Sequence, residues 1–272
     1  MNGIEGKVAI VTGAGRGIGQ AVALGLAEEG ALIVANDLDQ EPLDETLQII
    51  HSMGGKAVGL AASVGDAAIG TRLADLAVSN FGDIHLVFTA AGFTWDGMIH
   101  RMTDDQWQAI IDIHLTGTFR VLRDAFSVMR DNAKTAMDHG DVPVARHLVT
   151  VSSQSGFGNL GQANYAAAKA GIVGLTRTIA LEGAMFNIVA NSVAYGAIDT
   201  RLTRARESQE ERLGEAVLGI PQNRRDEMVG DLPMKRVGTV EEAAGPVIFL
   251  CSDQSNYVSG ALLEINGASH IS

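Results

Sequence analysis

Short apolar segments rich in β-branched residues recur along the chain, and longer segments with the period of an amphipathic helix separate them. Successive positions in the short segments are apolar, which is typical of strands buried on both faces of a parallel sheet. Seven such strands are predicted, at residues 8–13, 32–37, 57–64, 85–92, 146–153, 187–196 and 261–267. Helices are predicted between them, among others at residues 17–29, 66–80, 104–130 and 162–183. Repeated strand–helix alternation indicates an α/β fold with a doubly wound parallel sheet and helices on both faces.

Two segments depart from this alternation. Residues 130–145 are polar and are interpreted as a surface connection before the fifth strand. Residues 201–231 are charged and mixed, and they are long enough for one or two mobile helices. A segment in this place is a natural lid over a site at the carboxyl ends of the strands. Without internal repeats or a linker, the sequence predicts a single domain over residues 1–272 with a lid at 201–231.

Composition and charge narrow the function classes. The formal net charge of -12 argues against nucleic-acid and anionic-membrane partners, which require basic patches. The single cysteine, Cys251, excludes an internal disulfide and fits a reducing compartment. We find no signal peptide and no membrane span in the sequence, and no metal site is predicted, so a cytoplasmic protein is expected.

A glycine cluster follows the first predicted strand and precedes a helix. Its spacing fits T-G-x-x-x-G-x-G, with Thr12, Gly13, Gly17 and Gly19 at the defined positions. Glycines allow a tight turn and a close approach of the backbone to a pyrophosphate, which the positive helix N-terminus attracts. A glycine-rich turn without a ligand is the alternative, because the pattern alone is weak.

The second strand ends at Asp37, near the offset expected of an acid that binds the ribose hydroxyls of a dinucleotide. A carboxylate there repels a 2′-phosphate, so NAD is favoured over NADP. Arg16, within the glycine turn, leaves NADP open because a basic side chain could hold that phosphate. Asp37 could also be a solvated loop residue or a helix cap, a role open to Asp39 as well.

Tyr165 and Lys169 are four residues apart and would share one helical face. A phenol with a pKa of about 10 is a weak acid–base group at neutral pH, and a neighbouring ammonium lowers that pKa. Two serines, Ser152 and Ser153, end the strand before this helix. A serine hydroxyl there could hydrogen-bond a carbonyl oxygen, so the set predicts a carbonyl/alcohol redox site with a nicotinamide as hydride carrier.

Several motifs together resemble the short-chain dehydrogenase/reductase family, single-domain branch. They are TGAGRGIG, NDLD, TAAG, SS…GNLGQANYAAAKAG and PMKRVGTVEEAAGPVIFLCS…YVSGALLEING, and they span about Lys7 to Gly267. The resemblance implies a Rossmann-type fold, a nicotinamide cofactor, and a homodimer or homotetramer. It also implies that Tyr165 is the catalytic acid/base and that Lys169 binds the nicotinamide ribose and lowers the pKa of the tyrosine.

The resemblance also assigns the cofactor site residue by residue. Ile198 and Thr200 match positions that contact the nicotinamide carboxamide and the pyrophosphate. The implied cofactor-binding residues are Gly13, Gly15, Arg16, Gly17, Ile18, Gly19, Asp37, Leu38, Ser63, Val64, Ala91, Gly92, Tyr165, Lys169, Ile198 and Thr200.

The sequence departs from the family pattern at several of these places. The usual N-N-A-G is Thr89-Ala90-Ala91-Gly92, and the usual Asp-Val beside the adenine is Ser63-Val64. His114 stands where the family has an Asn that anchors a water leading protons to the lysine. A neutral histidine could anchor the water or shuttle protons, or it could be a helix-packing residue bonded to a backbone carbonyl. Tyr195 replaces a proline and is expected to place an aromatic ring beside the nicotinamide.

The identity of the catalytic serine is a question of register. Family members carry it about thirteen positions before the tyrosine, which is Ser152, whereas alignment of the strand makes it Ser153. Strand alternation sends the two side chains to opposite faces, so one alone can enter the site. Ser153 is favoured because a strand end keeps its register better than a glycine-bearing loop.

The leading hypothesis is an NAD-dependent oxidoreductase that interconverts a secondary alcohol and a ketone, with a small-molecule substrate. The first alternative is a 3-oxoacyl-thioester reductase acting on acyl-carrier-protein or CoA thioesters, and the second is a catalytically silent NAD-binding sensor or scaffold. Substrate identity lies beyond the sequence. Phe93, Trp95, Phe157 and Tyr195, with parts of 201–231, are candidates for an apolar pocket and equally for core or surface aromatics.

Overall fold

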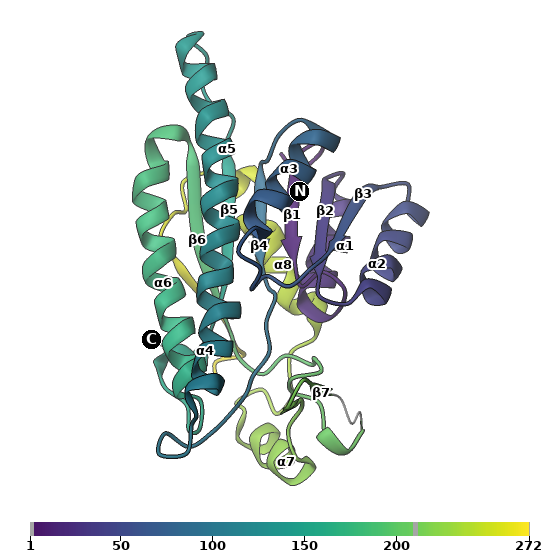
Figure 1. The fold of residues 1–272 in the computed structure, drawn as a ribbon, viewed down its shortest axis with the longest axis vertical. Coiled ribbons are helices and arrows are strands. Elements are labelled where there is room, and N and C mark those ends of the chain that lie inside the picture. The colour runs from purple at the N-terminus through teal and green to yellow at the C-terminus, as the bar shows by residue number, and fades with distance from the viewer. Residues whose placement is uncertain (1–2, 209–211, 272) are drawn as a thin grey trace.

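A seven-stranded parallel sheet forms the centre of the molecule in the computed structural model, which describes residues 3–208 and 212–271. The strand order is β3-β2-β1-β4-β5-β6-β9 (Figure 1). All seven predicted strands are confirmed, because segments that are apolar on both faces are covered by helices on both sides. Their bounds are β1 (Val8–Thr12), β2 (Leu32–Asp37), β3 (Lys56–Ala61), β4 (Leu86–Thr89), β5 (Arg146–Ser153), β6 (Ile188–Tyr195) and β9 (Leu262–Ile265).

Helices cover both faces of the sheet, which confirms the doubly wound α/β fold. One core joins the sheet to α1 (Gly17–Glu28), α2 (Gln40–Ser52) and α8 (Val240–Leu250). A second core, on the other face, joins it to α3 (Ile69–Phe81), α5 (Thr118–Asp138) and α6 (Ala163–Gly183). Within the described residues, no helix is both long and apolar enough to cross a membrane.

The prediction of a polar connection at 130–145 is wrong for its first part, because α5 continues to Asp138. Leu122, Ala125, Met129 and Ala133 are buried at spacings of three and four residues. This stripe keeps the helix on the sheet even though its other positions are polar. Only the segment after Asp138 forms the connection to β5.

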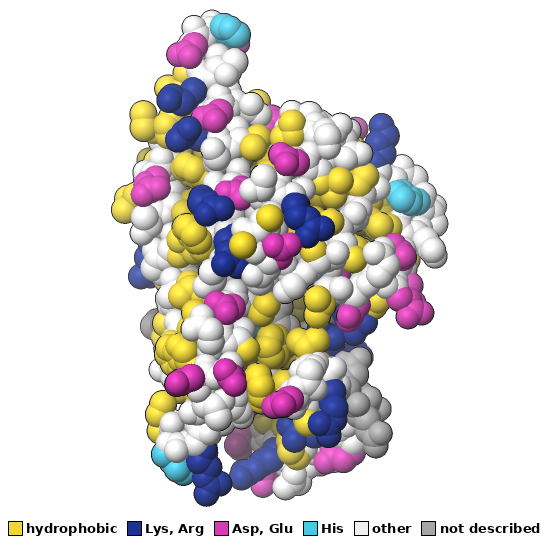
Figure 2. Space-filling model, in the orientation of Figure 1, with side chains coloured by type: hydrophobic (Ala, Val, Ile, Leu, Met, Phe, Trp, Pro, Cys, Tyr) yellow, Lys and Arg dark blue, Asp and Glu magenta, His cyan; other side chains and the backbone are white. Residues whose placement is uncertain are grey.

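The segment 201–231 forms a separate small substructure at one end of the molecule (Figure 1). It contains the antiparallel strands β7 (Arg212–Leu213) and β8 (Ala216–Val217) and one α-helix, α7 (Gln222–Asp231). Residues 209–211 of the predicted lid lie outside the described residues. Figure 2 shows hydrophobic side chains where this substructure meets the rest of the molecule.

A third apolar cluster forms that contact. Leu213, Ala216 and Leu218 pack in it with Phe93, which follows β4, and with Tyr165, in the first turn of α6. The segment therefore lies over side chains that follow the carboxyl ends of the strands, where the sequence places the lid.

Stability in acid is expected to depend on His147, which is fully buried in β5. Burial, reinforced by the charge of Lys7, lowers the pKa of His147 from its ordinary 6.5 to about 4. The unfolded chain then takes up a proton near pH 6.5 and the folded protein does not. The free energy of unfolding should fall between pH 6.5 and pH 4, by up to about 3 kcal/mol from this group. His85, whose pKa burial also lowers to about 4, should add to the loss.

Urea unfolding at pH 7, 5.5 and 4.5 measures this effect. Since carboxylates also titrate in this range, the comparison is with His147→Gln, which lacks the titrating ring. The variant should show a shallower loss of stability between pH 6.5 and 4.5 than the wild type. Equal slopes would contradict the prediction.

Candidate active site

The glycine turn lies at the point where the strand order reverses, because β1 pairs with both β2 and β4. In open α/β sheets, ligands bind in the crevice outside this point. Gly13 and Gly17 have positive φ angles of 67° and 58°. A Cβ on Gly13 would lie 2.8 Å from the Ala91 nitrogen, and one on Gly19 would lie 2.0 Å from the Gly13 oxygen. The turn therefore requires glycine at these positions. Its backbone leads directly into the N-terminus of α1.

Asp37, at the end of β2, faces this turn. Its carboxylate accepts hydrogen bonds from the Gly15 nitrogen at 2.8 Å and from the Asp39 nitrogen at 3.1 Å. Arg16 forms an ion pair with Asp39, with 3.3 Å between the two charged groups. The Arg16 side chain, which left NADP open as a cofactor, is therefore paired with the Asp39 carboxylate, and this pairing weakens its attraction for a 2′-phosphate.

The other implied cofactor residues surround the same crevice. Ile18 is part of α1 and packs against the first core, while Leu38 is half-exposed after β2. Ser63 accepts a hydrogen bond from the Gly65 nitrogen at 3.1 Å. The methyl group of Thr200 lies 3.6 Å from the position of a Cβ on Gly17, so Thr200 borders the glycine turn.

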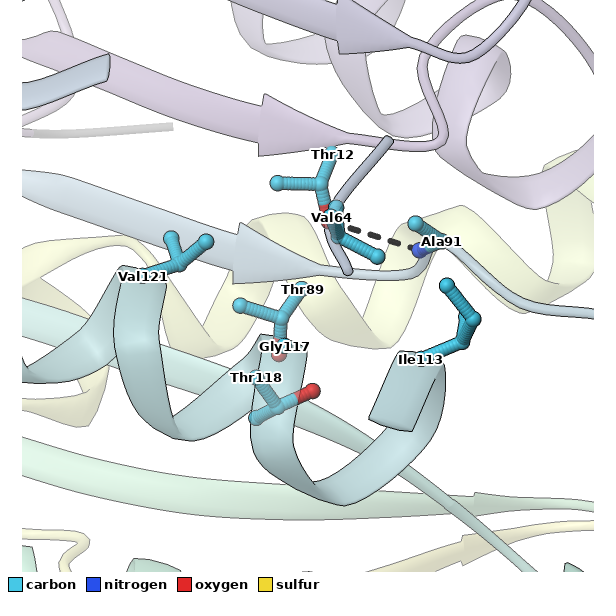
Figure 3. A pocket seen from close by; sticks show the side chains of 8 residues that line it. All are labelled: Thr12, Val64, Thr89, Ala91, Ile113, Gly117, Thr118 and Val121. Carbon is cyan, nitrogen blue, oxygen red and sulfur yellow. Dashed lines mark hydrogen bonds between the residues drawn. The ribbon is translucent and has the colours of Figure 1, made fainter. Parts of the chain in front are cut away.

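The turn after β4 is held by a threonine that sequence reasoning did not single out for this role. The hydroxyl of Thr12 accepts hydrogen bonds from the Ala90 and Ala91 nitrogens at 3.2 Å and 3.3 Å. Figure 3 shows the bond to Ala91 across a small pocket that Val64 and Thr89 also line. The Thr89 hydroxyl is buried and has no hydrogen-bond partner within the described residues. The Ala91 N–H is thus already used within the protein, and contacts of the Ala91 and Gly92 backbone with a cofactor stay a prediction.

The two serines at the end of β5 point to different places, as strand alternation requires. The Ser152 hydroxyl is buried and donates a hydrogen bond to the Lys169 carbonyl oxygen at 2.9 Å. The Ser153 hydroxyl accepts a hydrogen bond from the Ser155 nitrogen at 3.1 Å, and it lies close enough to the Tyr165 phenol to lower the pKa of that phenol. Ser153 is thus the serine beside the phenol.

Tyr165 and Lys169 share one face of α6. The Lys169 ammonium lies 5.4 Å from the centre of the Tyr165 ring and donates a hydrogen bond to the Val151 oxygen at 2.7 Å. Burial lowers the pKa of Lys169 to about 7. A lysine with that pKa is partly neutral near pH 7, so its electrostatic effect on the phenol is weaker than the sequence suggested.

The pKa of Tyr165 lies above its ordinary value of 10.0 in this structure, opposite to the expected direction. Burial raises it to about 12, the nearby Ser153 hydroxyl acts against the rise, and the Asp96 carboxylate adds to it. The phenol is accordingly protonated at neutral pH and can donate a proton. Ser153, Tyr165 and Lys169 lie together, as the sequence predicts.

His114 lies against this group in a π-helical turn (Asp112–Gly117) between α4 (Asp104–Ile111) and α5. Its ring meets the Tyr165 ring edge-on, with centroids 4.9 Å apart. Nε2 lies 2.6 Å from the Phe93 carbonyl oxygen and 3.2 Å from the Phe93 nitrogen. The shorter contact is to an atom that can only accept, which favours a proton on Nε2. The buried Nδ1 has no partner within the described residues. Burial and the Lys169 charge hold the pKa of His114 well below its usual value.

The contact with the Phe93 carbonyl oxygen fits the alternative of a packing histidine bonded to a backbone carbonyl, and the low pKa of His114 argues against a proton shuttle that would have to become charged. Gly92 makes room for the His114 ring, because a Cβ there would lie 2.1 Å from the imidazole Cε1. Sequence reasoning assigned only a backbone contact to Gly92. Neither the π-helical turn nor this contact has a local sequence signal, since both depend on how α5 meets the turn after β4.

The expectation for Tyr195 is wrong. Its side chain is buried in the first core, and its hydroxyl donates a hydrogen bond to the Ala243 carbonyl oxygen of α8 at 3.0 Å. The residue ends β6, and alternation turns it towards α8. Ile198 follows it and is buried in the same core, with its backbone bridged to Gly238.

The remaining aromatic residues predicted to line an apolar pocket lie in two different places. Phe93 and Trp95 join the cluster around Tyr165. Phe157 is 49% exposed and stacks on His270 from the C-terminal tail instead.

Comparison with known proteins agrees with this arrangement. A family model described as "Enoyl-(Acyl carrier protein) reductase" matches residues 13–270. The 3-oxoacyl-[acyl-carrier-protein] reductase FabG of Thermotoga maritima is 34% identical to the chain, covering 97% of this chain and 98% of its own. The chain belongs to the short-chain dehydrogenase/reductase family.

Further members share its full length. The FabG of Escherichia coli K12 is 35% identical over 98% of each protein. The (3R)-3-hydroxyacyl-CoA dehydrogenase of Canis lupus familiaris is 34% identical over 97% of this chain and 96% of its own. A crystal structure from Sinorhizobium meliloti 1021, classed with the short-chain alcohol dehydrogenases, superposes with a TM-score of 0.83. Its sequence is 29% identical to this one, and the superposition covers 97% of this chain and 96% of that chain. Members of this family are oxidoreductases that bind a nicotinamide cofactor.

Proposed function

We propose that this short-chain dehydrogenase/reductase interconverts a secondary alcohol and a ketone with NAD as cofactor. The observation that carries the proposal is the position of Tyr165, near the Ser153 hydroxyl and with the Lys169 ammonium 5.4 Å from the centre of its ring. The side chains and backbone of this site fit a dinucleotide. A Cβ on Gly13 or Gly19 would fill the glycine turn, and β2 ends with the Asp37 carboxylate beside that turn.

Each side chain has a separate task in this mechanism. The nicotinamide, when bound, supplies the hydride chemistry at the carbonyl carbon. Tyr165 donates its phenolic proton to the carbonyl oxygen in reduction and takes it back in oxidation. Ser153 donates a hydrogen bond to the same oxygen as negative charge develops there. Lys169 binds the cofactor ribose. Neutral His114 anchors the water that leads protons to Lys169.

The lid and the assembly are part of the same proposal. Segment 201–231 covers the site, and its apolar contacts with Phe93 and Tyr165 exclude water from the reacting groups. A homodimer or homotetramer is proposed, in keeping with the family.

A 3-oxoacyl-thioester reductase is the second candidate function. It is favoured by the full-length similarity to two FabG proteins, named 3-oxoacyl-[acyl-carrier-protein] reductases, and to a (3R)-3-hydroxyacyl-CoA dehydrogenase. A thioester of this class is itself a ketone, so the roles of Tyr165 and Ser153 are unchanged. The candidates differ in what binds beyond the reacting carbon.

Absorbance of NADH at 340 nm, followed with purified protein, separates the candidates. Simple ketones and acetoacetyl-CoA are compared at equal concentrations. Turnover of ketones with a higher kcat/KM than acetoacetyl-CoA supports the leading function, and the reverse order supports the second. Binding of NADH without turnover of any substrate would contradict both and favour a sensor.

The NAD preference is expected to depend on Asp37. Wild-type protein should bind NADH more tightly than NADPH, because the 2′-phosphate would approach the Asp37 carboxylate. Asp37→Ala should strengthen NADPH binding by about 10-fold, the scale of one charge interaction at an intermediate dielectric. Fluorescence titration measures both affinities. Asp44→Ala, on the exposed side of α2, is the matched control. Tighter NADPH binding by the wild type would contradict the assignment.

A further inference from the structure

The chain after β9 folds back over the 3₁₀ turn that follows the site serine. This tail, residues 266–271, contacts the turn Gln154–Phe157 at two places. The Ser269 hydroxyl donates a hydrogen bond to Gln154 Oε1 at 2.7 Å. The His270 ring stacks on the Phe157 ring, with centroids 4.3 Å apart and planes 14° from parallel.

The tail is fixed at its base before it reaches the turn. Asn266 Nδ2 donates to Glu264 Oε2 at 2.9 Å and to the His270 carbonyl oxygen at 2.8 Å. His270 Nδ1 lies 3.0 Å from the same Glu264 oxygen. The imidazole therefore has one edge fixed by the last strand of the sheet and one face against Phe157. Because the His270 ring is held in place by Glu264, it cannot move together with the turn Gln154–Phe157. The stacking contact therefore restrains the turn.

The turn in question sets the position of Ser153. It begins directly after that residue, and the Ser155 nitrogen donates to the Ser153 hydroxyl. On its other side the turn packs on α6, where a Cβ on Gly156 would lie 3.3 Å from the Ala170 nitrogen. The turn is thus held between the helix that carries Tyr165 and the C-terminal tail.

Space around the contact is tight, which limits alternative positions of the tail. A Cβ on Gly196, at the end of β6, would lie 2.7 Å from the Asn266 Cβ and 3.0 Å from Gln154 Oε1. The turn also contains Gly156 and is followed by Gly158 with a φ of 114°. A backbone this permissive needs outside contacts to keep one conformation.

We propose that His270 is a positioning residue that holds Ser153 in the site through the stack on Phe157. The inference rests on the proposed function for its kinetic consequence. A displacement of the order of 1 Å at a reacting group can cost about 100-fold in rate. Because the tail does not touch the glycine turn, loss of the stack should lower kcat and leave cofactor binding unchanged.

His270→Ala and Phe157→Ala are the variants that test this, with Ile271→Ala, whose side chain is 84% exposed, as the matched control. Each of the first two should lower kcat by about 10-fold or more, and the double variant should lose no more than one single variant. His270→Phe keeps a stackable ring and should recover much of the rate. NADH affinity and the unfolding temperature should stay near the wild-type values.

Wild-type kcat in His270→Ala, additive losses in the double variant, or no recovery in His270→Phe would overturn the proposal. Hydrogen–deuterium exchange of residues 153–161 gives a readout that is independent of turnover. Faster exchange in His270→Ala than in Ile271→Ala supports the restraint, and equal exchange rules it out. If the wild type itself shows no turnover, the proposed function fails while the exchange comparison still decides the role of the tail.

Discussion

Replacing Tyr165 with phenylalanine is expected to lower kcat by about 1000-fold, the scale of a lost general acid. The substitution removes the phenolic oxygen and keeps the ring. The edge-on contact with His114 and the position over Lys169 should therefore persist. In the proposed mechanism Tyr165, whose phenol burial keeps protonated, is the proton donor next to Ser153 in reduction. Without it, a carbonyl oxygen would develop negative charge with only a serine hydroxyl to stabilise it.

Steady-state kinetics in both directions measure this loss, and NADH titration checks that the cofactor site is intact. Tyr257→Phe is the matched control, because Tyr257 is fully exposed and far along the chain after α8. The control should behave as the wild type. A Tyr165→Phe variant with more than a tenth of the wild-type kcat would remove Tyr165 from the mechanism.

The sequence predicted the sheet because burial on both faces leaves a continuous apolar signal. Inner strands such as β1 and β6 are buried throughout, whereas the edge strands β3 and β9 are only partly buried and carry a weaker form of that signal. The end of α5 was missed because one narrow stripe, with Met129 and Ala133, holds an otherwise polar helix on the core. Loops such as the turn Gln154–Phe157 carry no periodic pattern, so their partners in the tail were not predictable.

The site was predictable where function requires residues close together in sequence. The four-residue spacing of Tyr165 and Lys169 on one helix is such a case. The positions of the His114 and Tyr195 side chains were not predictable, because they depend on contacts between elements far apart in the chain. His114 is buried against Gly92 and Tyr165, whereas Tyr195 turns into the core below α8. The direction of the Tyr165 pKa was missed for the same reason, since burial raises this pKa and also lowers the pKa of Lys169.

Ser153→Ala is expected to lower kcat by about 100-fold, the lower end of the range for loss of one hydrogen bond to a developing oxyanion. Its hydroxyl lies near the Tyr165 phenol, so under the proposed mechanism the substitution removes a hydrogen-bond donor to the reacting oxygen. Ser152→Ala should keep most of the activity. The Ser152 hydroxyl instead donates to the Lys169 carbonyl oxygen, so its loss should lower the free energy of unfolding by about 1 kcal/mol.

Kinetics and urea unfolding of the two variants separate these effects, because each serine serves as the control for the other. The two residues are adjacent, equal in size and on the same strand, and they differ only in the direction of the side chain. A loss of kcat confined to Ser152→Ala would mean that the spacing to Tyr165, and not the register of β5, determines the catalytic serine. A loss confined to Ser153→Ala would make the rigid strand end the element that positions the hydroxyl, with the turn after it free to differ in length.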